Sequence, residues 1–134
     1  MDDLGACFLR SVSIVGHNNR GCYYNLEYDP ESGRVISATT VLKGAVLGAL
    51  YGTPRYIWEV NHSEYIFVDE DLIVDVSHEV PRQILSLMRD DNQSDQPSNC
   101  EVRVEHLEDI MHFSVVATRN ICPGDELVYA VQSL

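Results

Sequence analysis

The sequence is poor in positive charge. It contains a single lysine, Lys43, and its 9 basic residues face 21 acidic ones, which gives a formal net charge of -12. A chain with this charge repels phosphate backbones, so we expect no direct contact with nucleic acid. The charge fits two interpretations: a basic partner, such as the cationic tail of another protein, or a surface charge that only keeps the protein soluble.

Paired cysteines and long apolar runs are also lacking. Cys7, Cys22, Cys100 and Cys122 lie far apart with no Cys-x-x-Cys pair, which argues against a zinc knuckle or a redox motif. The histidines have no metal-ligand spacing, so we expect no metal. No apolar run approaches the length of a membrane span, and the acidic start Met1-Asp2-Asp3-Leu4 lacks the cationic region of a secretory signal. We expect a soluble intracellular protein without membrane contact.

The length and composition indicate one globular domain over residues 1–134. Hydrophobic residues make up 45% of the chain, which is enough for a core without metal or disulfide support. Short runs with period-2 alternation and β-branched or aromatic enrichment predict a β-rich domain. The runs are Phe8 to Val15, Cys22 to Tyr28, Arg34 to Val41, Ala45 to Tyr51, Arg55 to Val60, Tyr65 to Val68, Leu72 to Val76, Glu101 to Glu105, Met111 to Thr118 and Glu126 to Val131.

One stretch departs from the strand pattern. Val80, Ile84, Leu87 and Met88 follow helical spacing, with Pro81 near the start, and predict a short helix. The polar segment that follows, residues 89–98, predicts an exposed loop.

The last third of the chain carries the most specific pattern. It reads Phe113-Ser-Val-Val-Ala-Thr-Arg-Asn-Ile-Cys-Pro-Gly-Asp-Glu-Leu127. Phe113 and Val115 fall on one face of a strand, and Pro123-Gly124 supplies a turn that reverses the chain. This order of strand, turn and Glu-Leu resembles the signature of the SET domain, the fold of protein-lysine methyltransferases.

Three further blocks resemble the same family in the same order. Val35 to Gly52 is similar to its opening strand, Lys-Gly turn and following glycine. Leu72 to Val76 resembles the next strand, in which an aspartate ends an apolar run. Arg89 to Cys100 resembles the family segment Arg-Phe-Ile-Asn-His-Ser-Cys-x-Pro-Asn-Cys. The resemblance spans residues 32–131 and leaves the first 31 residues unassigned.

The resemblance implies a fold, a cofactor and a partner. The fold is mainly β: the SET-domain or β-clip fold, with several small sheets, one short helix and a pseudoknot-like threading of the segment near Asn92 to Cys100 beside the last strand. The implied cofactor is S-adenosylmethionine. The implied partner is a basic protein tail such as a histone, or another protein, which makes a nuclear, chromatin-related location one of the intracellular options.

The resemblance also implies site residues. In the family, a Gly-x-Gly turn and the Asn-His segment hold the cofactor, while tyrosines line the channel for the substrate lysine. These roles fall on Gly33, Asn92 and Gln93 for the cofactor, and on Tyr129 and Tyr65 as catalytic residues.

Three positions depart from the family pattern. Arg34 stands at the second glycine and crowds the approach of a ligand to the backbone. Gln93 replaces the histidine, and Val131 stands at the last tyrosine, where a valine cannot donate a hydrogen bond. Simpler interpretations stay open at three places: an ordinary hairpin turn at Pro30 to Arg34, a solvated loop at Asn92 to Ser98, and plain packing of Tyr65 in a half-buried strand.

Three interpretations of function therefore remain. The favoured one is a weak or inactive relative of the S-adenosylmethionine-dependent protein-lysine methyltransferases that acts by binding protein. The second is an active methyltransferase on a basic tail. The third is an unrelated β-rich interaction module whose turns mimic the family.

Overall fold

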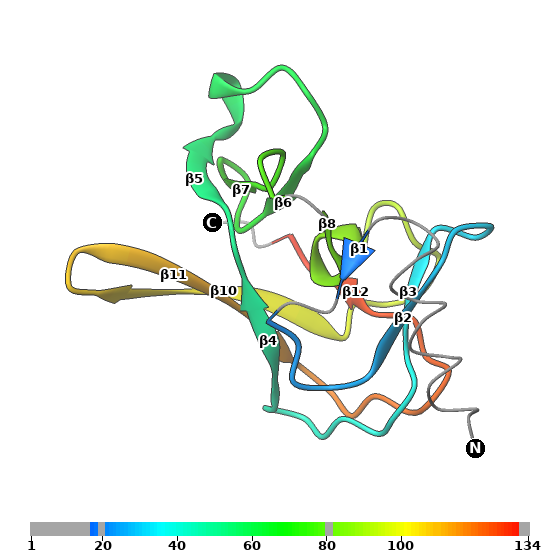
Figure 1. Cartoon of the computed structure of the whole chain (residues 1–134). Coiled ribbons are helices and arrows are strands. Elements are labelled where there is room, and N and C mark those ends of the chain that lie inside the picture. Colours follow the sequence, from blue (N-terminus) through cyan, green and yellow to red (C-terminus); the bar gives the residue numbers. More distant parts are fainter. Residues whose placement is uncertain (1–16, 19–20, 80–81, 132–134) are drawn as a thin grey trace.

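The computed structural model describes residues 17–18, 21–79 and 82–131, and the regular elements among them are strands and two short 3-10 turns (Figure 1). The largest sheet has five strands in the order β4-β11-β10-β12-β9. Its strands are β4 (Val46–Leu50), β11 (Ile110–Ala117), β10 (Cys100–Leu107), β12 (Val128–Tyr129) and β9 (Arg89–Asp90). The predicted strand over residues 8–15 lies outside the described residues.

Three smaller sheets accompany the large one. The three-stranded sheet has the order β5-β7-β6, and two strand pairs are β2-β3 and β1-β8. Their bounds are β5 (Thr53–Tyr56), β7 (Leu72–Asp75), β6 (Tyr65–Phe67), β2 (Leu26–Asp29), β3 (Arg34–Ser37), β1 (His17–Asn18) and β8 (Arg82–Gln83). The expected mainly β fold of several small sheets is confirmed.

The expected helix is a short 3-10 turn, η2 (Ile84–Leu87), and Val80 and Pro81 lie outside the described residues. Ile84 and Leu85 are fully buried, so the segment is enclosed and carries no solvated helix face. A second 3-10 turn, η1 (Ile57–Glu59), replaces the end of the strand predicted over residues 55–60.

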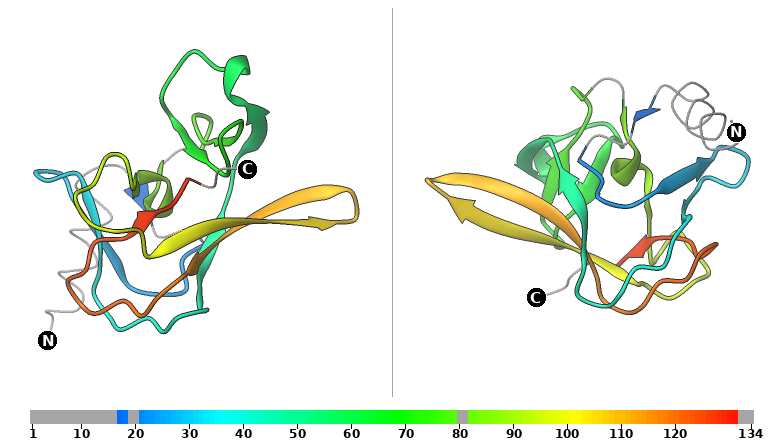
Figure 2. Two further views of the ribbon diagram at one scale, coloured as in Figure 1. Left: turned by 180° about the vertical axis from the view of Figure 1, so that it is seen from behind. Right: turned by 60° about the horizontal axis from the view of Figure 1, so that its bottom comes forward.

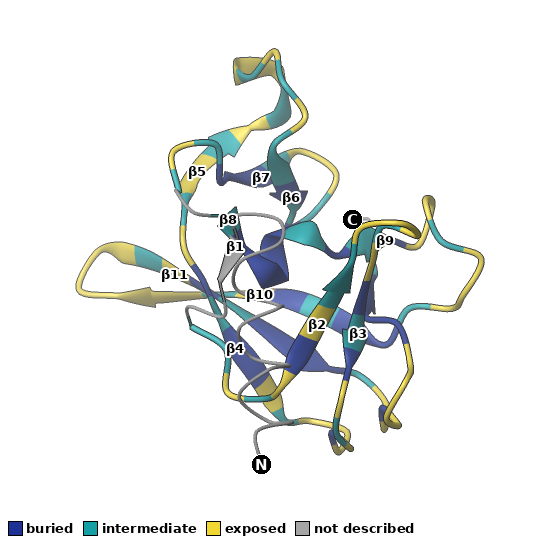
Figure 3. Ribbon diagram, turned by 45° about the vertical axis from the view of Figure 1, so that its right-hand side comes forward, coloured by how far each residue is buried: buried dark blue, intermediate teal, exposed yellow. Residues whose placement is uncertain are grey.

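The core lies where the inner ends of the strands meet η2, and the tip of the β10–β11 hairpin projects away from it (Figures 2 and 3). At that tip Leu107 is 54% exposed and Ile110 is 60% exposed. The core residues are Leu26, Val35, Val41, Leu47, Leu50, Ile66, Val68, Val74, Val76, Ile84, Leu85, Met88, Cys100, Val102, Phe113, Val115, Ala117, Ile121, Leu127 and Tyr129.

The last strand threads between two strands that precede it in the chain. β12 pairs in parallel with β9 on one side and with β10 on the other, while residues 91–99 connect β9 to β10 around it. Asn99 holds the passage: its Oδ1 accepts the Val128 N–H at 2.9 Å, and its Nδ2 donates to the Glu126 carbonyl at 2.8 Å. This arrangement is the expected pseudoknot-like threading.

Replacing Asn99 with alanine is expected to loosen the threading. The change leaves the Val128 N–H and the Glu126 carbonyl buried without these partners, which lowers the free energy of unfolding by about 3 kcal/mol. Urea denaturation measures the loss. The control is Asn92→Ala, because Asn92 is exposed; it should change stability by less than about 0.5 kcal/mol. Equal losses in the two variants would contradict the role of Asn99.

Candidate functional site

A cavity of about 260 Å³ lies beside the threaded strand, between β6, η2 and β9. It brings together three of the predicted site residues, Tyr65, Tyr129 and Gln93. Its other lining residues are Ser63, Ile66, Phe67, Arg82, Ser86, Leu87, Met88, Arg89 and Asp90. The site therefore combines two phenols and an amide with an apolar wall and two arginines.

Tyr129 is almost fully buried at the base of this cavity, with 2% of its surface exposed. Its hydroxyl oxygen accepts the backbone N–H of Phe67 at 3.3 Å. Burial raises the pKa of the phenol well above its usual range, so the hydroxyl stays protonated at neutral pH. Tyr129 is thereby tied to β6 and serves as a neutral hydrogen-bonding group.

Tyr65 is half-buried on β6 and packs edge-on against Phe67, with ring centroids 5.3 Å apart. In the sheet it pairs with Asp75, a buried carboxylate at the end of β7. Burial alone would raise the pKa of Asp75, but hydrogen bonds from the Ser77 hydroxyl and backbone, and from Arg55, hold it at about 2. A charged anchor thus fixes the strands that carry Tyr65.

Asp90 is buried although it lies in the segment predicted as an exposed loop. Its Oδ1 accepts the backbone N–H groups of Asn92 at 2.8 Å and Gln93 at 3.0 Å, which compensates the carboxylate for lost water. The Gln93 Oε1 accepts the Asp90 N–H at 3.1 Å. Gln93 is therefore folded back over the turn, whereas Asn92 is exposed and lines neither this cavity nor the one beside Glu126. The exposed-loop prediction was wrong for Asp90.

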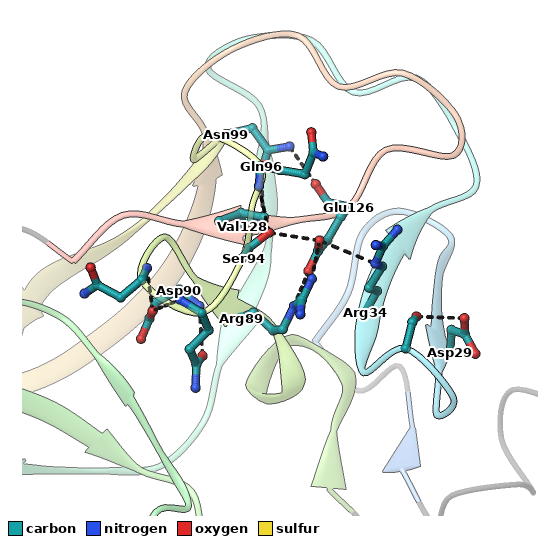
Figure 4. Close-up of polar contacts among 12 residues, drawn as sticks. Asp29, Arg34, Arg89, Asp90, Ser94, Gln96, Asn99, Glu126 and Val128 are labelled. Atoms are coloured by element: carbon teal, nitrogen blue, oxygen red, sulfur yellow. Dashed lines mark hydrogen bonds and ion pairs between the residues drawn. The ribbon is translucent and has the colours of Figure 1, made fainter.

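A second polar cluster surrounds the buried carboxylate of Glu126, three residues before Tyr129 (Figure 4). Arg89 binds it with both Nε, at 2.7 Å, and Nη2, at 2.9 Å. The Ser94 hydroxyl donates to Glu126 at 3.1 Å, and the Nε of Arg34 lies 3.9 Å from it. We call Arg34, Arg89, Ser94 and Glu126 the Glu126 cluster.

Burial of Glu126 alone would raise its pKa, but the hydrogen bonds from Arg89 and Ser94 outweigh burial and lower it. The carboxylate is therefore charged at neutral pH. The sequence patterns did not predict this cluster. The feature of the sequence that could have predicted it is a pair of opposite charges, Arg89 and Glu126, which lie in two separate blocks of the family resemblance.

Gly33 lies in the turn between β2 and β3 and has a φ of 72°, a left-handed conformation that favours glycine. Its N–H donates to the Asp29 carbonyl at 2.8 Å. A methyl group added at Gly33 would meet no other atom within 4 Å, so nothing packs closely against this glycine. The backbone conformation alone accounts for glycine here.

The three predicted cofactor residues do not share a cavity in the described part of the chain. Gln93 lines the cavity beside Tyr129, Asn92 is exposed, and Gly33 sits on the β2–β3 turn. The neighbouring cavity, about 310 Å³, is polar and is lined by Arg34, Asn99 and Glu126 among others. The cavity beside Tyr129, at about 260 Å³, is smaller than the roughly 300–1,000 Å³ of sites that enclose drug-sized ligands. As arranged, Gly33, Asn92 and Gln93 do not line one common pocket for S-adenosylmethionine.

The comparisons with known proteins place the fold. No protein-family model matches the chain, and no curated protein matches it. Two solved structures of KRYPTONITE, one in complex with mCHG DNA and SAH and one with mCHH DNA, the H3(1–15) peptide and SAH, each match 81% of this chain with a TM-score of 0.59 and 21% sequence identity. KRYPTONITE is a SET-domain histone methyltransferase, and the likeness gives this chain the SET-domain fold. An unrelated β-rich module is thereby set aside.

The chain matches only part of KRYPTONITE. The chain covers 24% and 23% of the two KRYPTONITE chains, so most of that protein has no counterpart here. Both structures contain DNA, so the comparison does not support our expectation of no nucleic-acid contact. Charge alone is too coarse a guide, because a local patch decides nucleic-acid binding.

The described residues contain neither a metal-binding cluster nor a membrane-spanning helix. No group of three or more histidine, cysteine, aspartate or glutamate side chains there is placed to hold a metal ion. In the same part of the chain, no helix has the length and apolar character needed to cross a membrane.

The Glu126 cluster yields a pH-dependent prediction. Arg89→Leu leaves the buried Glu126 carboxylate without its main partner and should destabilise the protein by about 3 kcal/mol at pH 7. The pKa of Glu126 is lower in the native fold than in the unfolded chain. In the wild type, the contribution of Glu126 to the free energy of unfolding is therefore lost only as the pH falls from the ordinary glutamate pKa to this lowered pKa. In the Arg89→Leu variant, burial should instead raise the pKa of Glu126, so that its carboxyl group becomes neutral in acid.

The stability difference between the wild type and Arg89→Leu should therefore shrink between pH 7 and pH 4, measured by urea denaturation at each pH. The double variant Arg89→Leu/Glu126→Leu serves as the control and should recover most of the loss, since no buried charge remains. A difference that stays constant with pH would contradict the assignment.

Proposed function

We propose that this SET-fold domain acts by binding a basic protein tail, such as a histone tail, and is a weak or inactive relative of the protein-lysine methyltransferases. The observation that carries the proposal is the Glu126 cluster. Arg34 stands where the family keeps a cofactor glycine, and its Nε lies 3.9 Å from the buried Glu126 carboxylate while half of the side chain stays exposed.

The tyrosine positions point the same way. Methyl transfer to a lysine requires a channel that positions the amine and shields it from water. Here the Tyr129 hydroxyl accepts a backbone N–H from Phe67, and partly buried Val131, at the place of the family's last tyrosine, packs against the core. Tyr129 is buried and Val131 has no hydroxyl, so Tyr65 is the half-buried phenol that lines this cavity.

The charge supports a basic partner. The net charge of -12 attracts a cationic segment and raises its rate of encounter. KRYPTONITE was crystallised with an H3(1–15) peptide, which is a statement about that protein. For this chain a histone tail is the proposed class of partner, with a nuclear location as its consequence.

A second candidate function is active methyl transfer with S-adenosylmethionine. It is favoured by the shared cavity of Tyr65, Tyr129 and Gln93, three residues that the family resemblance had assigned to this chemistry. The KRYPTONITE structures contain SAH, the product that S-adenosylmethionine leaves after methyl transfer, so S-adenosylmethionine is the cofactor to test. The bound cofactor would supply the methyl group, and the cavity would have to enlarge to admit it.

Two measurements separate the candidates. The first is calorimetric titration with S-adenosylmethionine and, separately, with mixed histones. The second is a radiolabel transfer assay on mixed histones and cell extract. The proposal predicts saturable binding of histones and no transferred label. Transfer of label would favour the second candidate, and absence of any histone binding would contradict the proposed partner.

The substitution Val131→Tyr tests whether one missing hydroxyl explains a loss of transfer. We expect no gain of radiolabel transfer, because Arg34 still occupies the cofactor turn. The matched control is Val131→Phe, which adds the ring without the hydroxyl. Label transferred by the tyrosine variant and not by the phenylalanine variant would contradict our account.

A further inference from the structure

A groove of about 640 Å³ runs along the outer edge of β10. One wall is the strand itself from Glu101 to His106, and the other is the turn between β6 and β7, with Val68, Asp69 and Leu72. Past Leu72 and Met111 the groove meets a second hollow of about 500 Å³, which extends to Tyr56 and Glu59. We call the two together the β10 groove; it is separate from the cavity that contains Tyr129.

The strand along this groove has free backbone groups. The Cys100 carbonyl accepts the N–H of Ala130, so Cys100 directs its backbone groups away from β11. Because the direction alternates along an antiparallel strand, Val104 and His106 also point theirs outward. Within the described residues, β12 pairs with β10 at Cys100 alone, and no other strand covers this edge.

The groove carries unbalanced negative charge. Its two arginines are already occupied, since Arg55 lies 3.0 Å from Asp75 and Arg103 lies 2.6 Å from Glu101. Four carboxylates of the walls have no cationic partner among the described residues. They are Glu59, Asp69, Asp71 and Glu105.

The chemistry of the walls specifies the occupant. An extended segment that pairs with an open strand edge presents its side chains alternately to two sides. On the side of Val104, Leu72 and Met111 offer apolar surface for aliphatic stems and Asp69 accepts a cationic end, while Glu105, the next residue of the strand, offers its carboxylate to the other side. Lysine and arginine combine an apolar stem with a cationic end, so a basic segment fits both features.

We propose that the β10 groove is the docking surface for a basic, extended segment of a partner protein, which adds to β10 as a further strand at Val104 and His106. The proposal rests on the proposed function of binding a basic tail, and it assigns that binding to a surface outside the cavity with Tyr129. Backbone pairing supplies affinity, and the carboxylates select for positive charge.

The test uses the full chain and a fluorescein-labelled synthetic peptide of twelve residues in which lysine alternates with threonine. A peptide with glutamate in place of lysine is the charge control. Fluorescence anisotropy should detect binding of the lysine peptide that weakens with salt, and no binding of the glutamate peptide.

Backbone amide exchange then locates the peptide. Hydrogen exchange followed by two-dimensional NMR should show slowed exchange at Val104 and His106 in the complex. Arg103 and Glu105 should change less, because their register with β11 already places their N–H groups toward that strand. Protection confined to residues 89–93 and 129 would overturn the docking surface and leave the proposed function standing. No binding of the lysine peptide or of histones would overturn both.

A pair of matched variants tests the charge. Asp69→Asn/Glu105→Gln removes two carboxylates of the groove and keeps an amide oxygen for the Asp71 and Leu72 N–H groups that Asp69 binds. It should weaken peptide binding about tenfold. The control Glu27→Gln/Glu31→Gln changes the net charge equally at exposed positions of β2 and its turn, and should change binding less than about twofold. Equal losses of peptide binding in the two double variants would overturn the proposal. A peptide-free protein that forms a dimer in which the Val104 and His106 amides are protected would overturn it as well.

Discussion

The passage of the last strand between β9 and β10 is the constraint on which the rest of the structure depends. Asn99 fixes it with bonds to Val128 and Glu126, which places Tyr129 beside one cavity and the Glu126 carboxylate beside the other. Each of the two polar sites is thus assembled from segments far apart in sequence. A change that loosens the passage would disturb both sites together.

Local patterns predicted the strands well and the polar contacts poorly. Alternation and turn residues located most strands, and the order of family-like blocks located the threading. Burial of Asp90 could not be predicted, because it depends on backbone N–H groups that a turn directs inward. The bond between Arg89 and Glu126 spans 37 positions, so no window of local sequence contains it. The short segment at η2 was too brief for its periodicity to distinguish a helix from a 3-10 turn.

Carboxylates play two different roles in this acidic chain. Asp75 and Glu126 are buried, matched by hydrogen bonds and arginines, and have lowered pKa values, so they hold the fold. Those of the β10 groove line its walls beside the apolar side chains of Leu72, Val104 and Met111. The buried carboxylates pair with Arg34, Arg55 and Arg89, whereas Glu59, Asp69, Asp71 and Glu105 have no cationic partner among the described residues. The separation explains how one domain combines a rigid polar interior with an attractive surface.

The central claim, which rests on the proposed function, is that Gly33, Asn92 and Gln93, the positions to which the family resemblance assigned the cofactor, bind none. The direct measurement is a two-dimensional NMR amide spectrum of the protein titrated with SAH. Our account predicts that Gly33, Asn92 and Gln93 keep their chemical shifts at every concentration. Saturable shifts at all three residues together would contradict it.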